Sequence, residues 1–68
     1  MILEKKAKRV FDYLKTKQDG ATRAEIQRDL QLAFATVQER LWQLIASELV
    51  DYRVGSDYRT LYYFAIRD

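Results

Sequence analysis

The stretch ATRAEIQRDLQLAFATVQERLWQLIASELV, residues 21–50, holds two short helical patterns separated by only a few residues. The first opens on a capping box, in which the Thr22 hydroxyl accepts from the Glu25 N–H and the Glu25 carboxylate accepts from the Thr22 N–H. Two apolar residues at i, i+4 spacing, Ile26 and Leu30, follow this signal. We therefore predict a helix over residues 23–30.

A second apolar stripe predicts another helix over residues 34–47, after a connector at residues 31–33 that contains neither Gly nor Pro. Leu32 does not continue the stripe of the preceding helix, so the break is inferred from the change of phase. One side of the new helix is expected to be apolar and the other polar. The apolar members are Val37, Leu41, Leu44 and Ile45, with Phe34 at the edge.

The segments on either side complete the pattern. Residues 2–17 have apolar residues at helical spacing, and Asp19-Gly20 predicts a turn that ends this first helix. After residue 48 the sequence alternates between apolar and polar residues and is rich in β-branched and aromatic types. With Gly55-Ser56-Asp57 as turn residues, it predicts a hairpin of strands 49–54 and 59–66.

Composition narrows the class of protein. A chain of 68 residues predicts one domain with a single small core. It contains no Cys, no His, no Gly-rich phosphate loop and no metal-ligand spacing, so we expect no disulfide, no metal, no cofactor and no catalysis. The net charge of +2 is too small to indicate nucleic-acid binding by itself. Nucleic-acid binding must therefore be judged from where the charges lie.

The start of the chain, MILEKKAKRVFDYL, argues against a signal peptide because charges interrupt every apolar run. No segment approaches the length of a membrane span. We therefore expect a cytoplasmic protein of a bacterial, archaeal or viral host cell, with no membrane partner. Met1 favours a complete small reading frame, and a domain cut from a larger protein is the alternative.

Three helices with a tight connection between the second and third, followed by a hairpin, resemble the winged helix-turn-helix DNA-binding domains of small prokaryotic and viral transcriptional regulators. ATVQERLWQL, residues 35–44, stands where that family has its recognition helix, and YRVGSDYRTLYYFAI, residues 52–66, is similar to the wing. The resemblance covers essentially the whole chain, 1–68, as a single domain. It implies an α+β fold, double-stranded DNA as partner, the third helix in the major groove and the wing on a neighbouring groove or the backbone.

The resemblance assigns outward side chains of the third helix to bases, and groups near the second helix and the wing to phosphates. Gln pairs with adenine and Arg with guanine, Glu accepts from cytosine, and the Thr methyl contacts thymine. The base-contact candidates are Thr36, Gln38, Glu39, Arg40 and Gln43. The backbone candidates are Thr22, Arg23, Arg28, Arg53, Tyr58 and Arg59, helped by free N–H groups at the start of the second helix.

Two features depart from the family pattern. Ala33-Phe34 stands where a Ser or Thr cap is usual, and a missing cap destabilises a helix by about 1 kcal/mol. Arg40 is the only cation expected on the outward face, and Glu39 near its centre needs Arg40, Arg28 or a cytosine amine as a partner. A second function therefore stays open, a protein-interaction module that uses the face with Trp42 and Glu39.

The aromatic residues also have structural interpretations. We expect Trp42 to lie across the hairpin as a partly buried lid, and Phe34 to cover the edge of the core or to staple the start of its helix. Tyrosines of the hairpin are expected to pack in cross-strand pairs (Tyr52, Tyr62, Tyr63), except Tyr58 at the wing tip. The basic cluster Lys5, Lys6, Lys8 and Arg9 is expected to be a solvated helix face. A homodimer, which we also expect, would use the first helix or the hairpin edge.

Overall fold

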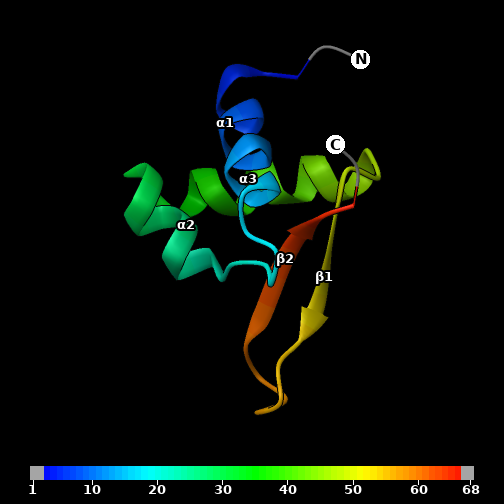
Figure 1. Cartoon of the computed structure of the whole chain (residues 1–68). Helices are drawn as coiled ribbons and strands as arrows, with labels where there is room; N and C mark the ends of the chain where they lie inside the picture. The colour runs from blue at the N-terminus through cyan, green and yellow to red at the C-terminus, as the bar shows by residue number, and fades with distance from the viewer. Residues whose placement is uncertain (1–2, 67–68) are drawn as a thin grey trace.

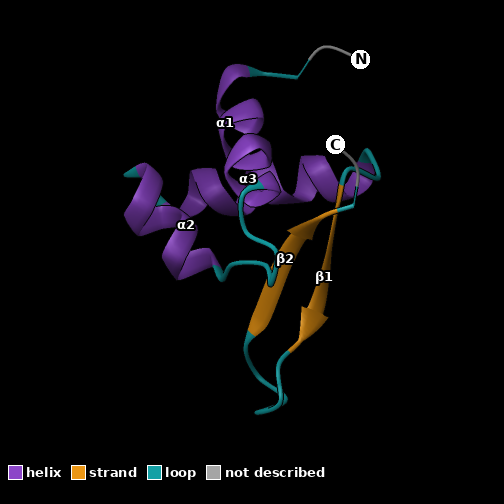
Figure 2. Cartoon of the chain, viewed as in Figure 1, coloured by secondary structure: helices purple, strands orange, loops and turns teal. Residues whose placement is uncertain are grey.

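The computed structural model describes residues 3–66, which form three helices followed by an antiparallel two-stranded sheet (Figure 1). The hairpin projects away from the three packed helices (Figure 2). This is the α+β layout of a winged helix-turn-helix, so the predicted fold class is confirmed. The elements are α1 (Lys5–Lys15), α2 (Arg23–Leu30), α3 (Phe34–Ala46), β1 (Val50–Val54) and β2 (Leu61–Ala65).

Helix α1 is shorter than predicted at both ends. It begins at Lys5 because Glu4 is its N-cap, with the carboxylate accepting from the Ala7 N–H. It ends at Lys15, where the Thr16 N–H bonds back to the Tyr13 and Leu14 carbonyls. Of the residues predicted before Glu4, Leu3 is not helical and residue 2 lies outside the described residues.

Helices α2 and α3 are joined by a three-residue turn at the predicted place. Gln31 adopts the left-handed conformation, with φ 55° and ψ 47°, so α2 stops without a Gly or Pro. The capping box of Thr22 and Glu25 is confirmed. Ala33 is the N-cap of α3 and makes no side-chain hydrogen bond, as predicted, and α3 ends one residue earlier than expected.

The hairpin strands are slightly shorter than predicted. The turn begins after Val54 as expected but extends to Thr60, and the outer ends of the strands lie one residue further in, at Val50 and Ala65. The register pairs Val50 with Ala65 and Val54 with Leu61, and the Gly55 N–H closes the loop on the Thr60 carbonyl at 2.7 Å. On its other side β2 is bridged by Ala21, which exchanges two backbone hydrogen bonds with Tyr63. The loop that precedes α2 is thereby fixed to the sheet.

The core lies between α1, α3 and the base of the hairpin. Its members are apolar, and most of them belong to the predicted helical stripes. In α2 only Ile26 is fully enclosed, because Leu30 is half-buried. The buried residues are Ala7, Val10, Phe11, Leu14, Ala21, Ile26, Val37, Leu41, Leu44, Val50 and Tyr63.

Candidate nucleic-acid interface

The outward side of α3 is polar but carries little positive charge. Glu39 and Gln43 are exposed, and Thr36 and Gln38 are half-buried on its two flanks. The Glu39 Oε1 atom lies 3.5 Å from the Arg40 Nη1 atom, so Glu39 takes one of the partners that the sequence proposed for it. The exposed face of α3 therefore offers amides and a carboxylate, without a cation at its centre.

Arg40 lies on the flank of α3 that faces α1, so its expected place as the cation of the outward face is wrong. Its side chain is 18% exposed, and its Nε lies 2.7 Å from the Glu4 Oε2. The contact is an ion pair without a well-aligned hydrogen bond, because Nε has no acceptor in good geometry. The N–H groups of Lys6 and Ala7, together with Arg40, hold the pKa of Glu4 below its usual value. Arg40 thus ties α3 to the start of α1.

On the opposite flank, Arg23 connects the first residue of α2 to α3. Its Nη1 donates to the Gln38 Oε1, and its guanidinium lies 5.0 Å from the centre of the Phe34 ring. Phe34 is 47% exposed, so its predicted role as a cover for the core is wrong. The ring instead lies beside the cation. Arg23 has no carboxylate partner among residues 3–66, so its charge is not neutralised.

Two adjacent hollows lie between α3, the start of α2 and the hairpin, and we call them together the α3–wing groove. The first, about 370 Å³, has Trp42 and Tyr52 on its walls, and the second is about 310 Å³. Arg23 and Leu61 line both. The remaining lining residues are Gln38, Leu41, Ile45 and Tyr63 in the first hollow, and Thr22, Ala24, Gln27, Phe34, Arg59 and Thr60 in the second.

Trp42 is a wall of this groove and not a lid. Its side chain is 60% exposed, so the predicted burial across the hairpin is wrong. It follows the buried Leu41 by one residue, a rotation of about 100° around α3 that directs it away from the core. Tyr52 and Tyr63 do form the predicted cross-strand pair, with ring centres 6.1 Å apart.

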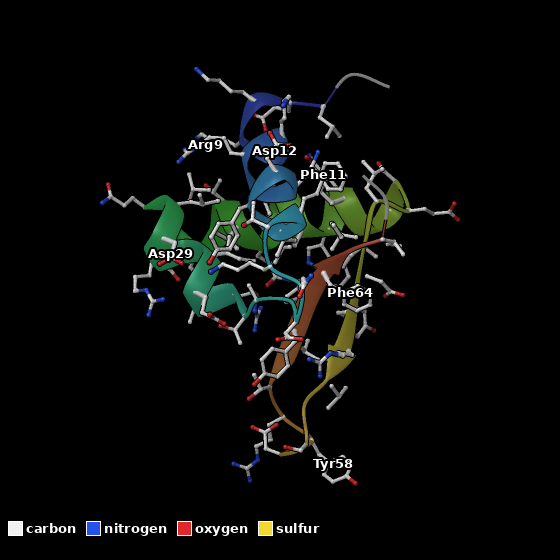
Figure 3. All side chains as sticks on the ribbon, viewed as in Figure 1. Arg9, Phe11, Asp12, Asp29, Tyr58 and Phe64 are labelled. Atoms are coloured by element: carbon white, nitrogen blue, oxygen red, sulfur yellow. The ribbon has the colours of Figure 1, made fainter. Side chains whose placement is uncertain are left out.

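The wing tip is organised by one carboxylate. Asp57 accepts from the Thr60 hydroxyl and from the N–H groups of Thr60 and Arg59. These hydrogen bonds, that of the Thr60 hydroxyl first, lower the pKa of Asp57 to about 2. Tyr58, with φ 60° and a side chain 89% exposed, stands at the tip as predicted (Figure 3).

The backbone candidates divide into two groups. Thr22, Arg23 and Arg59 line the α3–wing groove, and no other described residue forms an ion pair with Arg59. Arg28 and Arg53 lie outside that lining and have other contacts. The Arg28 Nε is 3.0 Å from the Asp29 Oδ1, and Arg53 donates to the Asp19 carbonyl while lying 4.9 Å from the Tyr62 ring centre.

The basic cluster on α1 is remote from the wing. Its four residues are exposed, in agreement with the predicted solvated face. Lys8 pairs with Asp12 at 2.8 Å, and Arg9 donates to the Leu30 carbonyl at the end of α2. In Figure 3, Arg9 lies at the opposite end of the molecule from Tyr58. The cluster and the tip of the wing therefore lie at opposite ends of the molecule.

Sequence reasoning missed the contacts that join distant segments. Nothing in the pattern connects Arg23 with Gln38, or Glu4 with Arg40, because these pairs are 15 and 36 positions apart and lie on different helices. The exposure of Trp42 had a signal, since its phase on α3 already placed it beside the polar side.

Within residues 3–66, no helix is long and apolar enough to cross a membrane, and no cluster of three or more acidic side chains could hold a metal ion. A comparison with protein-family models finds no match, and a comparison with curated proteins finds no significant match. The geometry of the α3–wing groove is therefore the basis for a functional assignment.

Proposed function

We propose that this protein binds double-stranded DNA, as a small cytoplasmic transcriptional regulator that works as a dimer. Helix α3 would enter the major groove, and the wing would contact the backbone or the minor groove next to it. The observation that carries the proposal is the α3–wing groove, in which Arg23 and Arg59 line one hollow and Arg23 also lines the other, together with Gln38 of α3. Both cations lack a carboxylate partner among the described residues.

The dimensions suit this docking. A helix of 13 residues is about 20 Å long, and the major groove is about 12 Å wide, enough for one α-helix with its side chains. The tip of the wing lies well beyond the helices (Figure 1), so it would reach a part of the duplex that α3 does not touch. Positioning through phosphates and reading through bases would thus fall to different elements.

The roles follow from the chemistry of each side chain. Gln43 and Gln38 would pair with adenine, Glu39 would accept from a cytosine amine, and the Thr36 methyl would contact thymine. Arg40 could reach a guanine only after leaving Glu4, so we give it the last place among the base contacts. The phosphates would be held by Arg23, Arg59, the Tyr58 hydroxyl and the N–H groups near Thr22.

The test is a titration of labelled random-sequence duplex DNA at about 50 mM and 200 mM salt, followed by fluorescence anisotropy. Contacts of a few cations with phosphate predict an affinity that falls at least about tenfold between the two salts. Sequence selection with the wild type and with Gln43→Ala would then show whether Gln43 reads a base, as a changed preference at one position. Absence of binding at either salt would contradict the proposal.

A second function has one observation in its favour. Trp42 is largely exposed beside Glu39, and a large aromatic residue in water is more typical of a protein interface than of a phosphate-binding surface. The alternative is a protein-interaction module that uses this face. Trp42→Ala would then abolish partner binding, whereas DNA would give no salt-dependent signal.

A further inference from the structure

Strand β1 has an open edge. The sheet contains β1 and β2 only, and the far side of β2 is occupied by the bridge from Ala21. On the other side of β1 the described residues place no strand. From Asp51 to Val54 the side chains are exposed, and Tyr52 and Val54 are about half accessible to solvent. Such an edge is a template for a further strand.

The register shows which backbone groups point outward. Gly55 bonds to Thr60 across the hairpin, and Leu49 bonds to Ile66, so hydrogen-bonded pairs recur at every second residue between them. Arg53 and Asp51 therefore face β2 with their N–H and C=O groups. Val50, Tyr52 and Val54 direct theirs away from it. The hydrogen bonds of Tyr63 agree with this assignment. Tyr63 is the partner of Tyr52 in the register, and its N–H and C=O groups bond to Ala21 and not to β1.

We propose that this edge binds β1 of a second copy of the chain, antiparallel and centred on Tyr52. In that register Tyr52 lies opposite Tyr52 of the second copy, and Val50 lies opposite Val54 of the second copy. All three pairs that result are of the hydrogen-bonded type, which provides about six backbone hydrogen bonds. The inference concerns the free protein and does not depend on DNA binding.

Charge complementarity selects this partner and this register. Asp51 and Arg53 are exposed on the same face of β1, and across the two-fold axis each lies opposite the other. A shift of two residues in one direction would place Asp51 opposite Asp51, and a shift in the other direction would place Arg53 opposite Arg53. Like charges directly opposite each other destabilise a strand pair, whereas opposite charges stabilise it. The sequence of β1 is thus self-complementary in one register.

Two contacts in the single chain limit the strength of the pairing. Arg53 donates to the Asp19 carbonyl and must leave it to reach Asp51 of the second copy. The Asp51 Oδ1 accepts from the Tyr52 N–H at 2.7 Å, which covers the central donor of the edge. Pairing exchanges this bond for one to the second copy and turns the carboxylate toward Arg53 of that copy. One strand pair buries less surface than a standard interface. We therefore expect a weak dimer, which forms at high protein concentration.

The test is sedimentation equilibrium of the full chain from about 10 µM to about 1 mM, a range that detects weak association. The proposal predicts a monomer–dimer equilibrium for the wild type. Asp51→Arg or Arg53→Asp would each place two like-charge pairs in the interface and weaken the dimer by about tenfold or more. The double variant with both substitutions restores opposite charges, and its dissociation constant should return to near that of the wild type.

Two controls make the result decisive. Lys6→Glu changes the charge by the same two units as Arg53→Asp but lies on α1, and it should leave the dimer unchanged. Circular dichroism establishes that each variant is folded. The proposal is overturned if the wild type stays monomeric at the highest concentration, if the single charge reversals leave the dimer intact, or if the folded double variant fails to recover it.

Discussion

The helical body and the wing tip are held together by different forces. In the body, α1, α2, α3 and the base of the hairpin share one continuous set of buried apolar residues. In β1 only Val50 is buried, and beyond it the turn depends on the polar contacts of Asp57. The stability of the protein should therefore be determined in the body. The tip is free to carry exposed contact groups, because its side chains contribute little to the core.

The largest expected contrast comes from removing an apolar side chain at each place. Leu44 is 0% exposed, and Leu44→Ala should lower the free energy of unfolding by about 2–5 kcal/mol. Since one small core rarely provides more than about 3–5 kcal/mol, this variant should be partly or fully unfolded at 25 °C. Val54→Ala, at the exposed end of β1, should change the free energy of unfolding by about 0.5 kcal/mol or less. Urea unfolding followed by circular dichroism compares them, and equal losses would refute the contrast.

A smaller effect is expected where the body itself has a defect. Ala33 has the extended backbone of an N-cap but no side chain that can accept from the first turn of α3. Ala33→Ser should add this hydrogen bond and raise the free energy of unfolding by about 0.5–1 kcal/mol. Ala35→Ser, two residues into the same helix, is the matched control and should not stabilise. Urea unfolding of both variants is the measurement, and a gain shared by the two would exclude capping as the cause.

The smallest effect on global stability, and the most local one, is expected at the tip. The pKa of Asp57 is lowered to about 2 from 3.8, so its contacts stabilise the turn above pH 3.8 and are lost as the pH falls through about 2. The amide NMR signals of Arg59 and Thr60 should move with a midpoint near pH 2, and Asp57→Asn should abolish this transition. A midpoint near 3.8 would show that the carboxylate does not accept these hydrogen bonds.

Much of the body could be predicted from the sequence, because local rules decide it. The capping box defines the start of α2, and apolar spacing identifies the buried side of α3. The helix termini were less accurate. Glu4 caps the N-terminus of α1 and so determines that the helix begins at Lys5, and no periodicity signals that role. The left-handed turn at Gln31 could be inferred only from phase, since Gln has no special preference for it.

The candidate site was less predictable, because it depends on which side chains meet across elements. The outward position of Gln43 follows from helical phase alone, and the structure agrees. The helical phase of Arg40 places it between the buried and the outward sides of α3. Its ion pair with Glu4, the N-cap of α1, then directs its side chain toward α1. In the same way Arg23 turns toward Gln38 and Phe34, and leaves Phe34 exposed. Contacts between side chains of different elements leave no periodic pattern in the sequence.

The central claim is that the α3–wing groove, and not the cluster on α1, contacts the phosphates of DNA. The most direct measurement is the salt dependence of duplex binding for the wild type, Arg59→Ala and Lys6→Ala, in which both variants lose one positive charge. We predict that Arg59→Ala weakens binding to all sequences and reduces the slope of log K against log salt by about 1, whereas Lys6→Ala matches the wild type. Equal slopes for the two variants, or a loss confined to Lys6→Ala, would contradict the account.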